Sequence, residues 1–210
     1  MSISELLSLI AGATTVVVIA TYFKQVLKND SIPNPATWFI WLVVALLNTA
    51  TYFTVVEKSF FLSMIAIVQS VGFVMFMGYA LIRGKFGKVG NIELTSIALA
   101  LLVGIFWQTT GDAKVSNLLL QVIFLISFYP TILGLVKQQL KEKPFPWFLA
   151  VASYALLILA ILIDWNSTSA IALAFPIVNI LGNGSIGFIA LTQKRVVDKT
   201  SSTLDSNIFL

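Results

Sequence analysis

The chain of 210 residues contains no cysteine and no histidine. It therefore has no disulfide, no thiolate nucleophile, no imidazole acid–base group and no zinc site with sulfur or imidazole ligands. Charged residues make up only 10% of the chain, whereas soluble domains carry about a quarter. Its apolar segments contain no paired carboxylates and no serine–lysine set. These absences argue against an enzyme, and we expect neither a metal nor a cofactor.

Apolar residues are abundant instead, at 58% of the chain, and they fall in blocks of membrane-spanning length. Crossing about 30 Å of hydrocarbon takes roughly 17–25 helical residues. A bilayer offers no partner to an unpaired amide, so each block is predicted to be a helix. The sequence predicts an all-α membrane protein in the lipid bilayer, with seven transmembrane helices over residues 6–23, 36–55, 60–82, 94–109, 116–136, 146–163 and 168–192.

The basic residues are divided unequally between the two ends of these helices. Eleven of the 13 lie on the side of the first, third and fifth joints and of the C-terminus, and only Lys58 and Lys114 lie opposite. Short loops rich in Lys and Arg stay cytosolic. We therefore expect the N-terminus outside and the C-terminus in the cytosol of a bacterial inner membrane. Because the basic residues mark helix ends, the net charge of +4 gives no indication of nucleic-acid binding.

The five tryptophans also lie near helix ends. Tryptophan is enriched where membrane meets water, so we expect two aromatic belts. The inner belt would hold Trp38, Trp41 and Trp147, and the outer belt Trp107 and Trp165.

A single constant shift in numbering, which we call the repeat offset, superposes two parts of the chain without a gap. Two three-helix repeats are therefore predicted, over residues 1–90 and 113–197. A linker helix within 91–112 would join them, and a short polar tail, 198–210, is expected to be disordered. One linking span makes the repeats parallel, a transporter design with the substrate site between the halves. The pairs that define the offset are Lys28 with Lys137, Pro35 with Pro144, Trp38-Phe39 with Trp147-Phe148, Gly78 with Gly187, and Lys85 with Lys194.

This plan resembles the SWEET and PQ-loop superfamily of seven-span membrane transporters. The resemblance is carried by the basic joint before Pro35, by Phe128-Tyr129-Pro130-Thr131 in the fifth span, and by Asn179 in the seventh. It implies a facilitator with prolines as hinges and an asparagine in the third helix of each repeat. The chain departs from the family pattern because it has no Pro-Gln dipeptide, Ser70 pairs with Asn179, and no tryptophan is expected at mid-membrane.

Polar side chains inside the spans are the candidate binding residues. Pro176, Asn179 and Asn183 follow the spacing i, i+3, i+7 and share one helix face, which we expect to line a central pathway. The alternative is that these amides hold neighbouring helices together. Further candidates of the same kind are Gln69 and Ser70 in the third span and Asn48 and Tyr52 in the second.

Two prolines lie inside predicted spans, Pro130 in the fifth and Pro176 in the seventh. A proline removes one helical hydrogen bond and can kink the helix. We expect both to act as hinges during transport, and the alternative is a static kink, which is common in membrane helices.

No Asp, Glu, Lys or Arg lies near the middle of a predicted span. Proton-coupled transport needs such groups, so facilitated diffusion is favoured. A lining of amides and hydroxyls suits a small neutral polar solute, with a sugar-like molecule first. The alternatives are a nicotinamide-riboside-type vitamin transporter, which the charge bias disfavours, and a non-transporting receptor or scaffold, which would need ionisable residues in its cavity. The oligomeric state is left open.

Overall fold

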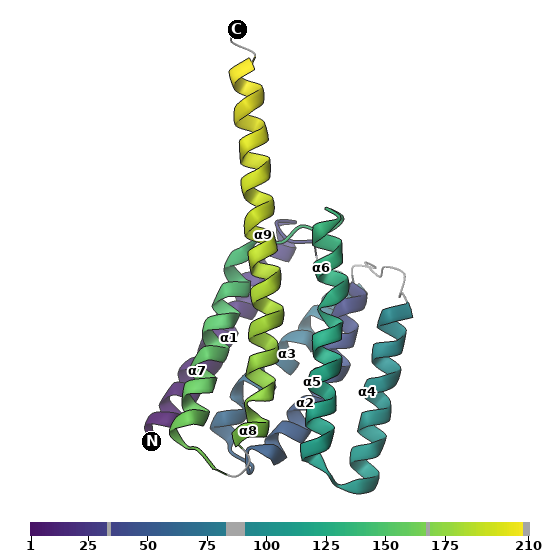
Figure 1. Ribbon diagram of the computed structural model, residues 1–210, viewed down its shortest axis with the longest axis vertical. Helices are drawn as coiled ribbons and strands as arrows, with labels where there is room; N and C mark the ends of the chain where they lie inside the picture. Colours follow the sequence, from purple (N-terminus) through teal and green to yellow (C-terminus); the bar gives the residue numbers. More distant parts are fainter. Residues whose placement is uncertain (33–34, 83–90, 167–168, 208–210) are drawn as a thin grey trace.

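The structure, a computed structural model, describes residues 1–32, 35–82, 91–166 and 169–207 (Figure 1). Within these ranges the chain is helical, and one isolated β-bridge is its only extended pairing. The helices are α1 (Ile3–Leu27), α2 (Pro35–Val55), α3 (Phe60–Ile82), α4 (Asn91–Thr110), α5 (Ala113–Ser127), α6 (Tyr129–Val136), α7 (Pro144–Ile163), α8 (Ser169–Ala172) and α9 (Ala174–Asn207).

Six stretches of the described chain are long and apolar enough to cross a membrane, where the sequence predicted seven. The remaining apolar helix, over Leu94–Thr110 in α4, is shorter. Many large apolar side chains on these helices are exposed, as expected for lipid-facing surfaces. The six stretches are Ile3–Leu27, Thr37–Val55, Phe60–Ile82, Ala113–Val136, Pro144–Ile163 and Ser169–Gln193.

The helix boundaries follow from local chemistry. The Ser2 hydroxyl and the Glu5 carboxylate cap each other's backbone N–H groups, which fixes the start of α1. The fifth predicted span is interrupted at Phe128, because Pro130 has no N–H for the carbonyl four residues earlier. Pro176 lies just inside α9, beyond a similar interruption that separates α8 from α9.

The helices α1, α3, α2, α5–α6, α9 and α7 pack in this order into a closed ring. Each helix in this series contacts the next, and α7 contacts α1. Helix α4 lies outside the ring against α2 and α5 (Figure 1). The C-terminal half of α9 projects beyond the other helices (Figure 1). Helix α9 continues to Asn207, whereas the sequence predicted a disordered tail from residue 198.

The segments that follow α1 and α6 have the same backbone structure, and we call them the first and second joints. Asn29 and Gln138, which the repeat offset pairs, both adopt left-handed φ angles, of 56° and 57°. The amide hydrogen bonds around them also repeat at this offset, with similar lengths. An antiparallel bridge joins Ile32 to Lys141, another pair at the same offset, and its N–H···O distance is 2.7 Å. An antiparallel pair is two-fold symmetric, so the joints meet around a local two-fold axis.

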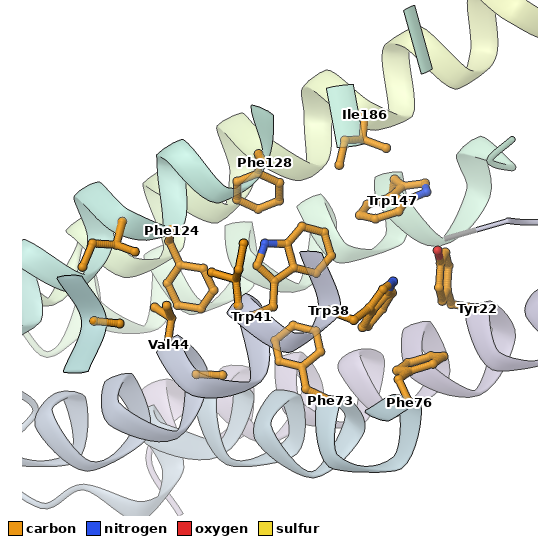
Figure 2. Packing of buried hydrophobic residues seen from close by; sticks show 14 of the residues in the cluster. Tyr22, Trp38, Trp41, Val44, Phe73, Phe76, Phe124, Phe128, Trp147 and Ile186 are labelled. Atoms are coloured by element: carbon orange, nitrogen blue, oxygen red, sulfur yellow. The ribbon is translucent and has the colours of Figure 1, made fainter. Parts of the chain in front are cut away.

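Two apolar clusters fill the interior of the ring, one toward each end. The joints lie at what we call the basic end, which carries Lys24, Lys28, Lys137, Lys141 and Lys143. The cluster nearest this end, the basic-end cluster, is rich in aromatic residues, which include Tyr22, Trp38, Trp41, Phe73, Phe76, Phe124, Phe128 and Trp147 (Figure 2). The far-end cluster includes Tyr52, Val55, Ile65, Tyr154, Leu157, Ile161 and Phe175.

The predicted inner tryptophan belt is wrong. Trp38, Trp41 and Trp147 are only 4–7% exposed and point into the basic-end cluster instead of toward lipid (Figure 2). The ring centroids of Trp38 and Trp41 lie 5.3 Å apart. Their helices are apolar on all sides, so the sequence does not indicate which face turns inward. Trp165, at 56% exposure, has the accessibility expected of an outer-belt residue.

Candidate functional site

A cavity lies inside the ring, between mid-depth and the basic-end cluster. Its lining comes from α1, α2, α3, α5, α7 and α9, with Phe128 at the α5–α6 interruption. The space open to the centre of a water-sized sphere is about 70 Å³. One water occupies roughly 10–15 Å³ on that measure, so the cavity has room for a few waters. The cavity brings polar and aromatic side chains from both ends of the chain into one place.

Three amide side chains lie in the lining of this cavity: Gln69, Asn179 and Asn183. The Asn179 side chain donates to the Phe175 carbonyl at 3.0 Å, and the Asn183 side chain donates to the Asn179 carbonyl at 2.7 Å. Within the described part of the chain, Asn179 Oδ1 and Gln69 Oε1 are buried and have no hydrogen-bond partner. Buried acceptors are normally paired, so a solute with hydrogen-bond donors would complete this site.

Aromatic side chains form the wall of the cavity toward the basic end. The Trp41 indole N–H donates to the Ser127 hydroxyl at 2.8 Å, which fixes the ring across the interface between α2 and α5. The centroids of Trp41 and Phe128 lie 5.2 Å apart. A Cβ on Gly182 would stand 2.2 Å from the Phe128 ring, so only glycine admits that ring. Trp41 thus presents a buried aromatic ring to the cavity, where the sequence predicted a residue of the membrane interface (Figure 2).

The other predicted binding residues are not among the described residues that line the cavity. The Ser70 hydroxyl bonds the Thr49 hydroxyl at 2.8 Å, which holds α3 against α2. The Tyr52 ring packs on Phe175 in the far-end cluster, with centroids 4.9 Å apart. Asn48 lies in a separate amide network. These three positions therefore contribute to helix packing.

The amide network joins α2 to α5. Asn48 Oδ1 accepts from Asn117 Nδ2 at 3.0 Å and from Gln121 Nε2 at 2.7 Å. Asn117 Nδ2 also donates to the Thr51 hydroxyl at 3.1 Å. All four side chains are buried. Asn117 was not among the predicted residues, although its spacing of four from Gln121 places both on one helix face.

The structure also reveals a buried acidic residue that was not predicted from the sequence. Glu142, in the second joint, is only 6% exposed, and its carboxylate accepts a 2.7 Å hydrogen bond from the Tyr22 hydroxyl. Burial raises the pKa of the Glu142 carboxyl to about 7. Tyr22 and Trp147, which both adjoin this carboxyl, line the cavity. In the sequence Glu142 stands between lysines and resembles a solvated loop residue.

A second acidic residue at the basic end has the opposite environment. Asp30 in the first joint is partly exposed and pairs with Lys143, with an Nζ–Oδ2 distance of 2.7 Å. The hydrogen bond from Lys143 lowers the pKa of the Asp30 carboxyl. Asp30 therefore stays ionised where Glu142 titrates.

The described residues contain no group of three or more His, Cys, Asp or Glu side chains that could hold a metal ion. No protein-family model, curated protein or solved structure matches the chain.

Proposed function

We propose that this chain is an integral membrane facilitator that carries a small neutral polar solute by alternating access. One observation carries the proposal: a cavity inside a ring of membrane-length helices holds the unpaired oxygens of Gln69 and Asn179, within the described part of the chain. Ligand sites are typically apolar hollows with a few convergent polar groups. A sugar-like solute fits this description, because its hydroxyls donate to amide oxygens and its C–H face packs on aromatic rings such as Trp41.

The proposed architecture has seven spans, with parallel repeats over 1–90 and 113–197 and a linker helix within 91–112. This architecture is supported by the two joints, which have matching φ angles and matching backbone hydrogen bonds at positions paired by the repeat offset. The ring contacts agree as well, since α1 and α2 both pack on α3, just as α5–α6 and α7 both pack on α9. The charge bias supports an outside N-terminus and a cytosolic C-terminus in a bacterial inner membrane.

Alternating access requires that each end of the cavity can open in turn. The far-end and basic-end clusters are the two candidate closures, because each draws side chains from helices of both proposed repeats. Pro130 and Pro176 adjoin helix interruptions, where a change of angle breaks few hydrogen bonds. We propose these interruptions as the hinges.

A second solute class is favoured by the aromatic wall of the cavity. Trp38, Trp41, Phe73 and Phe128 offer flat surfaces that suit a planar heterocycle as well as a sugar ring. A nicotinamide-riboside-type vitamin, which combines a planar ring with ribose hydroxyls, is therefore the second candidate.

Uptake into liposomes tests the proposal. Purified protein would be reconstituted and offered labelled hexoses, disaccharides, nicotinamide riboside and thiamine, alongside protein-free liposomes. We expect downhill uptake of one solute class, lost in Asn179→Ala and retained in Ser70→Ala, because Ser70 occupies the equivalent position outside the cavity. If no solute enters faster than into empty liposomes, transport is contradicted and a receptor or scaffold with this fold replaces it.

A further inference from the structure

The Glu142 carboxyl lies where four parts of the basic end meet. It belongs to the second joint, bonds Tyr22 near the end of α1, and adjoins Ser31 of the first joint and Trp147 near the start of α7. Its Oε2 atom is buried, and within the described residues it has no hydrogen-bond partner. A buried carboxylate normally pairs with a cation or with several donors. This one accepts the Tyr22 hydrogen bond at Oε1, and Ser31 and Trp147 stand beside it, but burial outweighs these donors and raises the pKa of the carboxyl.

The nearby cations do not form a salt bridge with Glu142. Among the described residues, Lys143 pairs with Asp30 of the first joint instead. The joints are further tied by the Ile32–Lys141 bridge and by the Lys143 backbone N–H, which donates to the Ser31 hydroxyl at 3.3 Å. The titratable or charged groups at this end of α1, α6 and the joints are Tyr22, Lys24, Lys28, Asp30, Lys137, Lys141 and Lys143.

The carboxyl is linked directly to the closure of the cavity. Tyr22 packs on Trp38 and on Trp147, with ring centroids 5.2 Å and 5.4 Å apart. Figure 2 shows the Tyr22 hydroxyl and the Trp147 indole nitrogen at the same end of the basic-end cluster. Separation of α1 from α7 at this end would expose Glu142 to water, because the neighbours of its carboxyl come from both helices and both joints.

We propose that Glu142 is a proton-binding site that controls the opening of the cavity at the basic end. A proton from water on that side binds Oε2, and the neutral carboxyl stays buried in the closed form. Loss of the proton leaves a carboxylate that is stable only when hydrated, so the ring opens around it. This inference rests on the proposed facilitator only for its consequence, a transport rate that depends on pH at the basic end. The described residues that line the cavity include no Asp, Glu, Lys or Arg that could supply the same dependence.

The direction of the pH effect follows from the two environments of the carboxyl. In the closed form burial raises the pKa of Glu142 to about 7, and in an open form water returns it toward the ordinary 4.5. The closed form binds the proton more tightly, so low pH favours the closed form. The population of the open form increases as pH rises through 7. Between pH 6 and pH 8 this linkage shifts the closed-to-open ratio by about tenfold.

The absence of native cysteine allows a direct measurement of opening that needs no transported solute. Ser153 lines the cavity and is buried, and Ser153→Cys adds one thiol at little steric cost. The rate at which a water-soluble maleimide modifies this thiol would be measured in purified protein from pH 6 to pH 8. The same cysteine in a Glu142→Gln protein is the matched control, because it corrects for thiol ionisation.

The readout is the modification rate in the protein that keeps Glu142, divided by the rate in the Glu142→Gln control. We expect this ratio to rise about tenfold between pH 6 and pH 8. An Asp30→Asn protein should keep the rise, since Asp30 stays ionised throughout. Tyr22→Phe should move the midpoint to higher pH, because the hydroxyl stabilises the carboxylate. A ratio that is flat with pH, or a Tyr22→Phe midpoint that does not move, overturns the proposal whatever the uptake experiments give.

Discussion

The two proposed repeats share a backbone plan but carry different polar groups. Their joints have the same pattern of backbone hydrogen bonds, and each has a residue with a left-handed φ angle at the equivalent position. Their third helices, α3 and α9, occupy equivalent places in the ring. Yet Ser70 stands in α3 where Asn179 stands in α9, and Val74 stands where Asn183 stands. The second repeat thus supplies two of the three cavity amides. In the proposed facilitator, the near-symmetric scaffold would open in two directions, and the asymmetric side chains would determine what it binds.

The two interfaces between the proposed repeats, α1–α7 and α2–α5, also have equivalent positions in the ring but different polar contacts. Helices α1 and α7 are joined by the Ser4 hydroxyl, which donates to the Ala160 carbonyl at 3.0 Å, and by the packing of Tyr22 on Trp147. Helices α2 and α5 meet through the buried amide network of Asn48 and Asn117. Between the helices themselves the first interface has fewer polar side-chain bonds than the second, although the joints tie it at the basic end. It is therefore the one expected to separate, and the second is expected to act as the fixed side.

The largest expected effect comes from changing the equivalent residues of α3 and α9. Asn179→Ala should weaken solute binding by about 5- to 150-fold, because a buried hydrogen bond of roughly 1–3 kcal/mol is lost. Ser70→Ala should change it less than about twofold, since Ser70 bonds only Thr49. Solute titrations that follow the fluorescence of the cavity tryptophans would measure both. Equal effects of the two changes would contradict the asymmetry.

A comparable effect, on stability instead of binding, is expected at the glycines of α9. In Gly182→Ala the new methyl would overlap the Phe128 ring at 2.2–2.4 Å, so the ring must move out of the basic-end cluster. Overpacking of this kind costs about 1–3 kcal/mol and should lower the thermal unfolding temperature in detergent. Gly184→Ala is the matched control, because its nearest neighbour would be Val151 at 3.7 Å. Similar melting of both variants would show that Phe128 is not held there.

The amide network offers a test of the fixed interface. Asn48→Ala leaves the donors of Asn117 and Gln121 without their shared acceptor, which should cost about 0.6–2 kcal/mol of stability. Ser8→Ala, at the position equivalent to Asn117, should cost little, because its hydroxyl has no partner among the described residues. Thermal unfolding of the two purified variants would compare them. Greater loss at Ser8 would reverse the assignment of fixed and opening sides.

The smallest effect is expected at the exposed ion pair between the joints. Asp30→Asn removes the contact with Lys143, and an exposed pair of this kind contributes little to stability. Its thermal unfolding should therefore shift by little, and added salt should reduce the difference further. A loss as large as that of Asn48→Ala would mean that the ion pair, and not the β-bridge, holds the joints together.

The helical segments were accessible to prediction because span length is set by the bilayer. Helix α3 matches the predicted range 60–82, and α2 differs from its predicted range by one residue. The interruption at Phe128 was less accessible. A proline signals a kink, but the residue at which the helix breaks depends on the packing of its neighbours. The length of α9 was not predicted, because the polar residues at its C-terminal end show no pattern of apolar residues that would indicate a helix.

The candidate site was accessible only in part. Gln69, Asn179 and Asn183 stand out because amides in an apolar span must turn away from lipid. Trp41 and Trp147 were assigned to the membrane–water interface. When a helix is apolar on every side, its sequence does not indicate which face points into the protein. The buried position of Glu142 could not be predicted from its lysine neighbours, since it depends on the contact between two joints that lie far apart in the sequence.

Solute counterflow would test the central claim of alternating access most directly. Liposomes containing the protein would be preloaded with the solute found by the uptake screen and diluted into a trace of labelled solute. We predict a transient accumulation of label above its final level, present in the unchanged protein and absent in Asn179→Ala. Label that enters without such an overshoot would indicate a pore, and label that does not enter would leave the cavity without a transport role.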